Sequence, residues 1–362
     1  MKIKIKKKYL FLACVLTVCL SLVVVMSCLS VPDFNEELWL ERVNAVDPQL
    51  LYAENKDKKG VFFNPWMPTS GEKNNGRMFR YMFSKKMSFP DFNAERYKHV
   101  DNQYDYLTDP QFNSISYAGH ASLFIKIDGS TIITDPFFSD YAGTVGKQVR
   151  VNVDFSKIPE RAVVLISHNH YDHLNAWTID RLIKRNAIFI VPQGLKEFFV
   201  KRGAVEVHEL NWWQDVSINS IKYTFLPAQH WSMRLGVKRN GSLWGGFMIE
   251  ASKTIYFSGD TGYFIGFKEF GNRFKIDYAI IGAGAYEPRW FMAYQHLNVA
   301  EFFLAADDLK AAIAIPMHFG IISLSAEPLL YPLFEIDLFI QENPKYSGRV
   351  RALRVGEFIG IP

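Results

Sequence analysis

Short apolar runs rich in β-branched and aromatic residues recur along the chain from about residue 114, and they end in glycine, aspartate or histidine. Runs of this length and composition between turn residues predict buried β-strands. The predicted strands are residues 122–127, 131–134, 162–166, 188–191, 223–225, 246–250, 254–257, 278–281 and 312–315. Residues 177–185, 195–201 and 299–309 have helical spacing of apolar positions, which predicts a mixed α/β fold with helices layered on sheets.

The N-terminus has a different pattern. Five lysines among residues 2–8 precede an almost unbroken apolar run over residues 9–26, and small or polar residues follow. This layout is typical of an export signal, which we assign to residues 1–27 and exclude from the fold. Residues 25–28 resemble a bacterial lipoprotein signal, in which Cys28 becomes lipidated. An uncleaved anchor and simple secretion are the alternatives, and all three place the body outside the cytoplasm.

Charge and cysteine content limit the classes of partner. Without the five N-terminal lysines, 36 basic residues face 37 acidic ones, so the body offers no electrostatic basis for binding nucleic acid. Cys14, Cys19 and Cys28 all lie in or beside the apolar run, so the body has no cysteine for a disulfide or a metal thiolate.

The body itself divides in two. Residues 28–110 are rich in turn residues, as over residues 64–76, and we interpret them as an extension that wraps around the main domain. Residues 111–362 contain the predicted strands and form the main domain.

Four metal-ligand side chains lie within six residues in the sequence His168-Asn169-His170-Tyr171-Asp172-His173, directly after a predicted buried strand. Imidazole and carboxylate suit zinc and related divalent ions. A structural role rarely requires four such groups together, so the cluster predicts a metal site. Three later positions, His230, Asp260 and His318, follow other predicted strands and could complete a site for two metals.

The ordered set of these seven residues resembles the signature of the metallo-β-lactamase superfamily, which implies a four-layered αβ/βα sandwich. Within it, the chain resembles the N-acyl-phosphatidylethanolamine-hydrolysing phospholipase D family over about residues 62–319. The matching stretches are residues 64–66, 119–121, 134–136, 167–174, 227–231, 243–245, 259–263, 284–292 and 294–296.

The resemblance implies how the two metals, zinc by preference, are held. His168, His170 and His230 would bind one ion, Asp172, His173 and His318 would bind the other, and Asp260 would bridge them. A hydroxide between two such ions would attack the substrate. The candidate catalytic residues are Asp172, Asp260 and His296, the last of which lies in a stretch specific to the phospholipase branch.

Other residues have alternative interpretations. Asp135 is either a partner for a ligating histidine or a turn cap. His120 is either a hydrogen-bonding residue of the core or a residue that supports the ligands. Arg234 and Arg289 are candidate phosphate contacts or solvated surface residues. The tryptophans could line an acyl-chain groove or belong to the core.

The leading functional hypothesis is a phospholipase D-type phosphodiesterase that acts on N-acyl-phosphatidylethanolamine-like lipids at a membrane surface. The alternatives are a lactonase or other ester hydrolase, and a non-catalytic surface lipoprotein that binds a metal or ligand. Residues 139–154 and 175–176 differ from the phospholipase pattern, and these differences bear on the substrate rather than on the metal chemistry.

Overall fold

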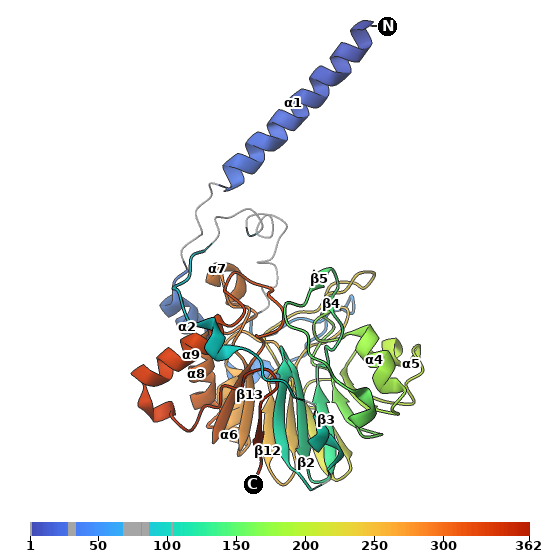
Figure 1. The fold of residues 1–362 in the computed structure, drawn as a ribbon, viewed down its shortest axis with the longest axis vertical. Coiled ribbons are helices and arrows are strands. Elements are labelled where there is room, and N and C mark those ends of the chain that lie inside the picture. The colour runs from blue at the N-terminus through green and yellow to red at the C-terminus, as the bar shows by residue number, and fades with distance from the viewer. Residues whose placement is uncertain (1, 28–33, 68–80, 82–86, 103, 110) are drawn as a thin grey trace.

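The computed structural model describes residues 2–27, 34–67, 81, 87–102, 104–109 and 111–362 (Figure 1). The lipidation predicted at Cys28 lies outside these residues. Over the described ranges, no helix combines the length and apolarity needed to cross a membrane.

Two large β-sheets and a small hairpin make up the β-structure of the described residues. One sheet has the order β15-β1-β2-β3-β6-β7-β8, and the other has the order β14-β13-β12-β11-β10-β9. The first sheet contains β1 (Ser114–Gly119), β2 (Ser122–Ile127), β3 (Ser130–Thr134), β6 (Val163–Leu165), β7 (Ile188–Pro192), β8 (Glu206–Leu210) and β15 (Phe358–Gly360). The second contains β9 (Asp215–Ile218), β10 (Ile221–Leu226), β11 (Gly246–Glu250), β12 (Thr254–Phe257), β13 (Tyr278–Gly282) and β14 (Ile313–Met317). The hairpin pairs β4 (Tyr141–Ala142) with β5 (Val145–Gly146).

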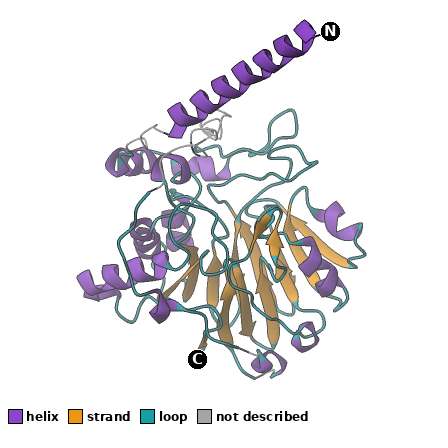
Figure 2. Ribbon diagram, turned by 45° about the horizontal axis from the view of Figure 1, so that its top comes forward, coloured by secondary structure: helices purple, strands orange, loops and turns teal. Residues whose placement is uncertain are grey.

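Helices cover the outer faces of the sheets (Figures 1 and 2). Ile125 packs in the core shared by the two sheets, whereas its neighbour Phe124 packs in a second core with Ile179 and Leu182 of α4. Strands that are buried on both faces need a covering layer on each side. The predicted αβ/βα sandwich is therefore confirmed.

The helices are α1 (Lys2–Ser27), α2 (Glu36–Asn44), α4 (Ala176–Ile183), α5 (Lys196–Val200), α6 (Gly266–Arg273), α7 (Arg289–Met292), α8 (Val299–Asp308) and α9 (Tyr331–Glu342). Short 3-10 turns are η1 (Pro48–Tyr52), η3 (Ala94–Tyr97), η4 (Asp105–Thr108), η5 (Phe155–Lys157) and η6 (Pro344–Tyr346).

The predicted elements are observed with end shifts of at most two residues, but several others were not predicted. The edge strands β8 and β9 are only partly buried, so their sequences lack a continuous apolar run. β1 was not predicted because it buries two serines, Ser114 and Ser116, where an apolar run would be expected. α6 was not predicted because it contains two glycines, which are unfavourable in helices.

Chain direction brings the ends of several strands to one edge of the sandwich. β1, β3 and β6 run in the same direction in one sheet, as do β10, β12, β13 and β14 in the other. The loops that follow the carboxyl ends of these strands therefore lie together at that edge. Three residues there, His120, Asp135 and His318, have φ values of 58°, 33° and 75°, a left-handed conformation that is uncommon outside glycine and is often found at functional sites.

The described part of the predicted extension packs on both sheets: residues 34–67 contact the six-stranded sheet and its helices, and residues 104–109 contact β2 of the seven-stranded sheet. Trp39 Nε1 donates to Glu301 over 2.8 Å, and Trp66 Nε1 donates to Gln229 over 3.2 Å. Trp39 and Trp66 belong to the same apolar core as both sheets. The boundary at residue 110 stays a prediction.

Candidate metal centre

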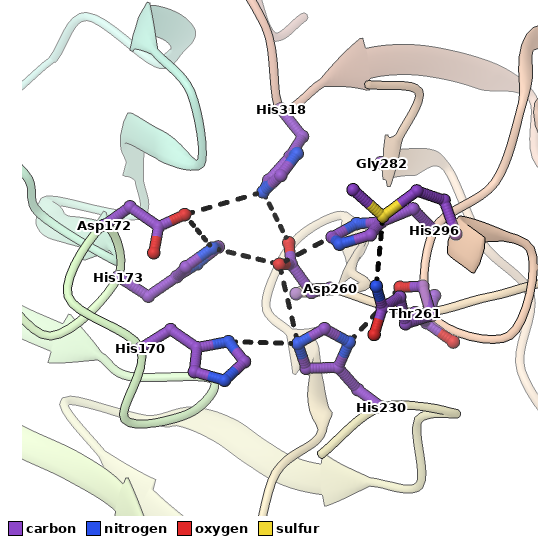
Figure 3. Close-up of polar contacts among 12 residues, drawn as sticks. His170, Asp172, His173, His230, Asp260, Thr261, Gly282, His296 and His318 are labelled. Carbon is purple, nitrogen blue, oxygen red and sulfur yellow. Dashed lines mark hydrogen bonds and ion pairs between the residues drawn. The ribbon is translucent and has the colours of Figure 1, made fainter. Parts of the chain in front are cut away.

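Four side chains at this edge form a first group, His168, His170, His230 and Asp260. His170 Nδ1 lies 2.8 Å from His168 Nε2. It also lies 3.2 Å from His230 Nε2 (Figure 3). Asp260 Oδ2 is 3.8 Å from His168 Nε2 and 3.7 Å from His230 Nε2. These four atoms lie within 4.8 Å of one another, so one ion placed among them could contact all four.

A second group lies on the other side of Asp260 and contains Asp172, His173 and His318 (Figure 3), together with the buried His120. Asp260 Oδ2 is 3.2 Å from His173 Nε2, and its Oδ1 is 3.0 Å from His318 Nε2. His173 Nε2 is also 3.3 Å from Asp172 Oδ2. The seven predicted ligands thus converge from four loops, with Asp260 between the two groups. Their role as ligands stays a prediction.

The loop that carries four of these residues leaves β6 and enters α4. Asn175 caps α4 by accepting a hydrogen bond from the backbone N–H of Thr178, which fixes the end of the loop. Arg234 Nη1 donates to the carbonyl oxygens of Asn169 over 3.1 Å and Leu174 over 2.8 Å. Arg234 therefore stabilises the loop of residues 168–174 and is not simply a solvated surface residue.

In two of the candidate ligands, His173 and His230, a neighbouring residue fixes the ring nitrogen that faces away from the centre. His173 Nδ1 is 2.7 Å from Asp135 Oδ2, and His230 Nδ1 donates to the carbonyl oxygen of Gln295 over 3.2 Å. These contacts direct Nε2 of each ring toward the centre. Of the two interpretations of Asp135, the structure supports the histidine partner.

His120 and Asn64 are residues whose roles the sequence left undetermined. His120 is buried, and its Nε2 lies 2.7 Å from Asp172 Oδ2. Asn64 Nδ2 donates to the backbone carbonyl of His230 over 3.2 Å. The sequence did single out stretches 119–121 and 64–66, because both match the phospholipase pattern. It did not indicate which residues His120 and Asn64 contact.

His296 lies beside the centre, with Nδ1 3.9 Å from Asp260 Oδ2 (Figure 3). Arg289 Nη1 donates to the backbone carbonyl of His296 over 3.2 Å. The same guanidinium is buried between Glu36 at 2.8 Å and Glu301 at 2.7 Å. The prediction that Arg289 contacts phosphate or solvent is therefore wrong, because its donors are used within the fold.

Some of the tryptophans lie in the hydrophobic core, and one lies beside the candidate metal centre. Trp212 and Trp244 are buried in the main core. The ring of Trp231 lies 4.5 Å from that of His170, and its Nε1 donates to Gln295 Oε1 over 2.7 Å. Trp231 therefore lies beside the candidate ligand His170 rather than in the main core.

Burial keeps several imidazoles of the centre neutral. It holds the pKa of His168 and of His230 well below the usual value, and it lowers the pKa of His120 to about 4. Neutral imidazole is the form that binds a metal ion.

The carboxylates of the centre are ionised despite their burial. Burial opposes ionisation of Asp260, but His173 and His318 outweigh it and hold the pKa of Asp260 well below its usual value. Burial likewise opposes protonation of His173, but Asp260, Asp172 and Asp135 raise its pKa well above the usual value. The buried carboxylates therefore require a positive charge nearby. A divalent cation would supply this charge in place of the proton on His173.

Several buried atoms of the centre are left without a hydrogen bond of standard geometry within the described chain. They are His173 Nε2, His318 Nε2 and Asp260 Oδ1, although the last two lie only 3.0 Å apart. Buried polar atoms of this kind are rare in folded proteins, and they fit a site that binds a ligand. Because the donors are imidazole nitrogens and carboxylate oxygens, the residues fit zinc and similar divalent ions.

Comparison with known proteins agrees with this chemistry. The model of the Beta-lactamase superfamily domain matches residues 130–319. The chain is 31% identical over 248 residues to the mitochondrial N-acyl-phosphatidylethanolamine-hydrolyzing phospholipase D of Saccharomyces cerevisiae, which covers 64% of this chain and 52% of that protein. It is 31% identical over 211 residues to a UPF0173 metal-dependent hydrolase of Nanoarchaeum equitans, covering 57% of this chain and 83% of that protein. The chain thus spans about half the length of the yeast relative.

A solved structure shares the fold. The crystal structure of a possible metal-dependent hydrolase from Veillonella parvula superposes with a TM-score of 0.58 at 19% identity, covering 69% of this chain and 100% of that one.

Proposed function

The chain belongs to the β-lactamase superfamily as a metal-dependent hydrolase, and we propose that it is a phospholipase D-type phosphodiesterase acting on N-acyl-phosphatidylethanolamine-like lipids. The observation that carries the proposal is the position of Asp260 between two groups of ligand-type side chains, with His296 beside them. The similarity to the yeast phospholipase supports the choice of substrate.

We propose that the centre holds two divalent ions, zinc by preference. His168, His170 and His230 would hold one ion, Asp172, His173 and His318 the other, and Asp260 both. Such a pair supplies Lewis acidity and activates water at neutral pH.

The remaining steps fall to side chains around the centre. His120 and Asp135 orient Asp172 and His173 through contacts of 2.7 Å each. His296 is only partly buried, so it can reach a bound phosphodiester and either hold a phosphate oxygen or protonate the leaving alcohol oxygen. Arg289 fixes the backbone of His296 for this role.

We also propose that the protein is exported and held at a membrane by lipid on Cys28, which would place it beside such a substrate. This proposal rests on the N-terminal sequence pattern.

Mass spectrometry of membrane lipids incubated with the purified full chain tests the function. We expect phosphatidic acid and the released headgroup amide, together with about two metal equivalents per chain. Asp260→Asn should lose nearly all turnover, whereas Asp215→Asn, on the exposed end of β9, should retain it. Opening of lactones without any phosphatidic acid would instead assign the centre to ester chemistry. Less than one metal equivalent with no hydrolysis would favour a non-catalytic protein.

A further inference from the structure

Two loops flank the metal-binding loop, and we call residues 139–151 and 231–242 the rim loops. Both contact Tyr171, which lies between the candidate ligands His170 and Asp172. The backbone N–H of Leu235 donates to the Tyr171 hydroxyl over 3.2 Å, and the turn at Gly143 packs against the Tyr171 ring. The rim loops therefore border the metal centre directly.

The tips of the rim loops carry large apolar side chains that are exposed. Leu235 is 90% exposed, Tyr141 is 63% exposed and Met233 is 48% exposed. Val145 and Val237 are exposed beside them. Exposed apolar groups gathered around a functional centre mark an interaction surface more often than isolated ones do.

The rim loops are also basic, although the body of the protein is close to neutral. They contain five basic side chains, Lys147, Arg150, Arg234, Lys238 and Arg239, against the single acidic Asp140. The side chain of Arg150 is 76% exposed, and Lys238 is exposed. This charge complements an anionic surface.

A groove of about 610 Å³ runs along the first rim loop to Tyr171. Its lining combines basic Lys147, Arg150 and Arg234 with aromatic Tyr141 and Trp177. Such a lining suits a phosphate-bearing headgroup that has an apolar part.

The chain reaches the body at the same edge as the rim loops. Glu36 pairs with Arg289, which in turn contacts the backbone of His296 beside the metal centre. Figure 1 shows α7, β4 and β5 on the same side of the body. Only five residues separate Cys28 from Phe34, the first described residue of the body, and six chain steps span about 20 Å at most.

We propose that the rim loops dock on the surface of an anionic phospholipid bilayer, with their apolar tips in the interface and the metal centre facing the lipid. This inference rests on the proposed function, because it explains how a lipid substrate reaches the centre. A short tether at Cys28 would hold the body in this orientation, and the exposed Arg150 and Lys238 would contact the headgroups.

Hydrogen–deuterium exchange of the full chain tests the docking independently of catalysis. The protein would be compared in detergent micelles and in vesicles of phosphatidylethanolamine and phosphatidylglycerol. We expect exchange to slow about tenfold at residues 141–146 and 233–238 in the vesicles. The segment around Val205, 92% exposed and at the start of β8 on the opposite edge of the sheet, should not change. Unchanged exchange in both rim loops would overturn the proposal.

A matched pair of variants gives a second test. Leu235→Asp should hydrolyse N-acyl-phosphatidylethanolamine in the same vesicles about tenfold more slowly, but cleave soluble bis(para-nitrophenyl) phosphate at the wild-type rate. Val205→Asp should match the wild type on both substrates. Equal vesicle rates for the two variants would overturn the docking. A wild-type chain that hydrolyses no phospholipid, yet shows slowed exchange in the rim loops, would refute the proposed function and leave the docking supported.

Discussion

Asp135 Oδ2 lies 2.7 Å from Nδ1 of His173, although the two residues are 38 positions apart in the chain. The other oxygen of Asp135 accepts a hydrogen bond from the backbone N–H of Ser167 over 2.7 Å. The carboxylate therefore fixes both the ring of His173 and the start of the metal-binding loop. It does so from the end of β3, which pairs with β6 in parallel.

Removing this charge should weaken metal binding. For Asp135→Asn we expect a loss of metal affinity of about 10–100-fold, because the partner that orients a ligating histidine is weakened. Competition with a chromophoric chelator measures the affinity. Asp215→Asn on β9 is the control and should bind as the wild type does. An unchanged affinity in Asp135→Asn would show that His173 is oriented by other contacts.

Gly284 allows a close approach that holds His318 in place. A Cβ at this position would lie 2.0 Å from the carbonyl oxygen of His318, which itself has a φ of 75°. Gly284→Ala should therefore displace His318 and lower kcat/KM by about 10²-fold. Gly360→Ala, where a Cβ meets nothing within 4 Å, should not. Steady-state kinetics on both variants checks this, and similar values for the two would contradict it.

Arg289 links α2, near the start of the body, to α8, which lies beside the metal centre. Its side chain is buried between Glu36 and Glu301. Arg289→Ala should lower the free energy of unfolding by about 3–5 kcal/mol, because it leaves the buried Glu301 without its cationic partner. Urea denaturation measures the change. Arg273→Ala, at an exposed position on α6, should cost far less, and equal losses would argue against the buried ion pair.

Glu287 should make stability depend on pH. Burial raises the pKa of Glu287 to about 7 from an ordinary value of 4.5, and Glu327 and Glu335 add to it against the opposing effect of Arg289. Between these values the folded protein keeps a proton that the unfolded chain has lost. The free energy of unfolding therefore falls as pH rises through this window.

Glu287→Gln should abolish that dependence. At pH values above 7 we expect the variant to be more stable than the wild type by about 1 kcal/mol, after allowing for solvent screening of a partly exposed carboxyl. Below the ordinary pKa the difference should vanish. Tm measured across this range in parallel with exposed Glu342→Gln provides the check, and a pH-independent difference would contradict the assignment.

Much of the fold followed from local pattern. The strands β2, β11 and β12 were predicted at their observed bounds, because each is a short apolar run between turn residues. β8 and β9 were missed, because edge strands are only partly buried and their pattern is set by the neighbouring strand.

The sequence by itself determined the chemistry of the centre. Ligand-type residues at fixed spacing after a buried strand need no tertiary contact to be recognised, and His168, His170, Asp172 and His173 are of that kind. Only the tertiary structure decided how they are supported. The contacts of Asp135 with His173, His120 with Asp172 and the rim loops with Tyr171 join segments far apart in the chain. Such pairings arise from strand direction and packing between sheets, which local spacing along the chain does not encode.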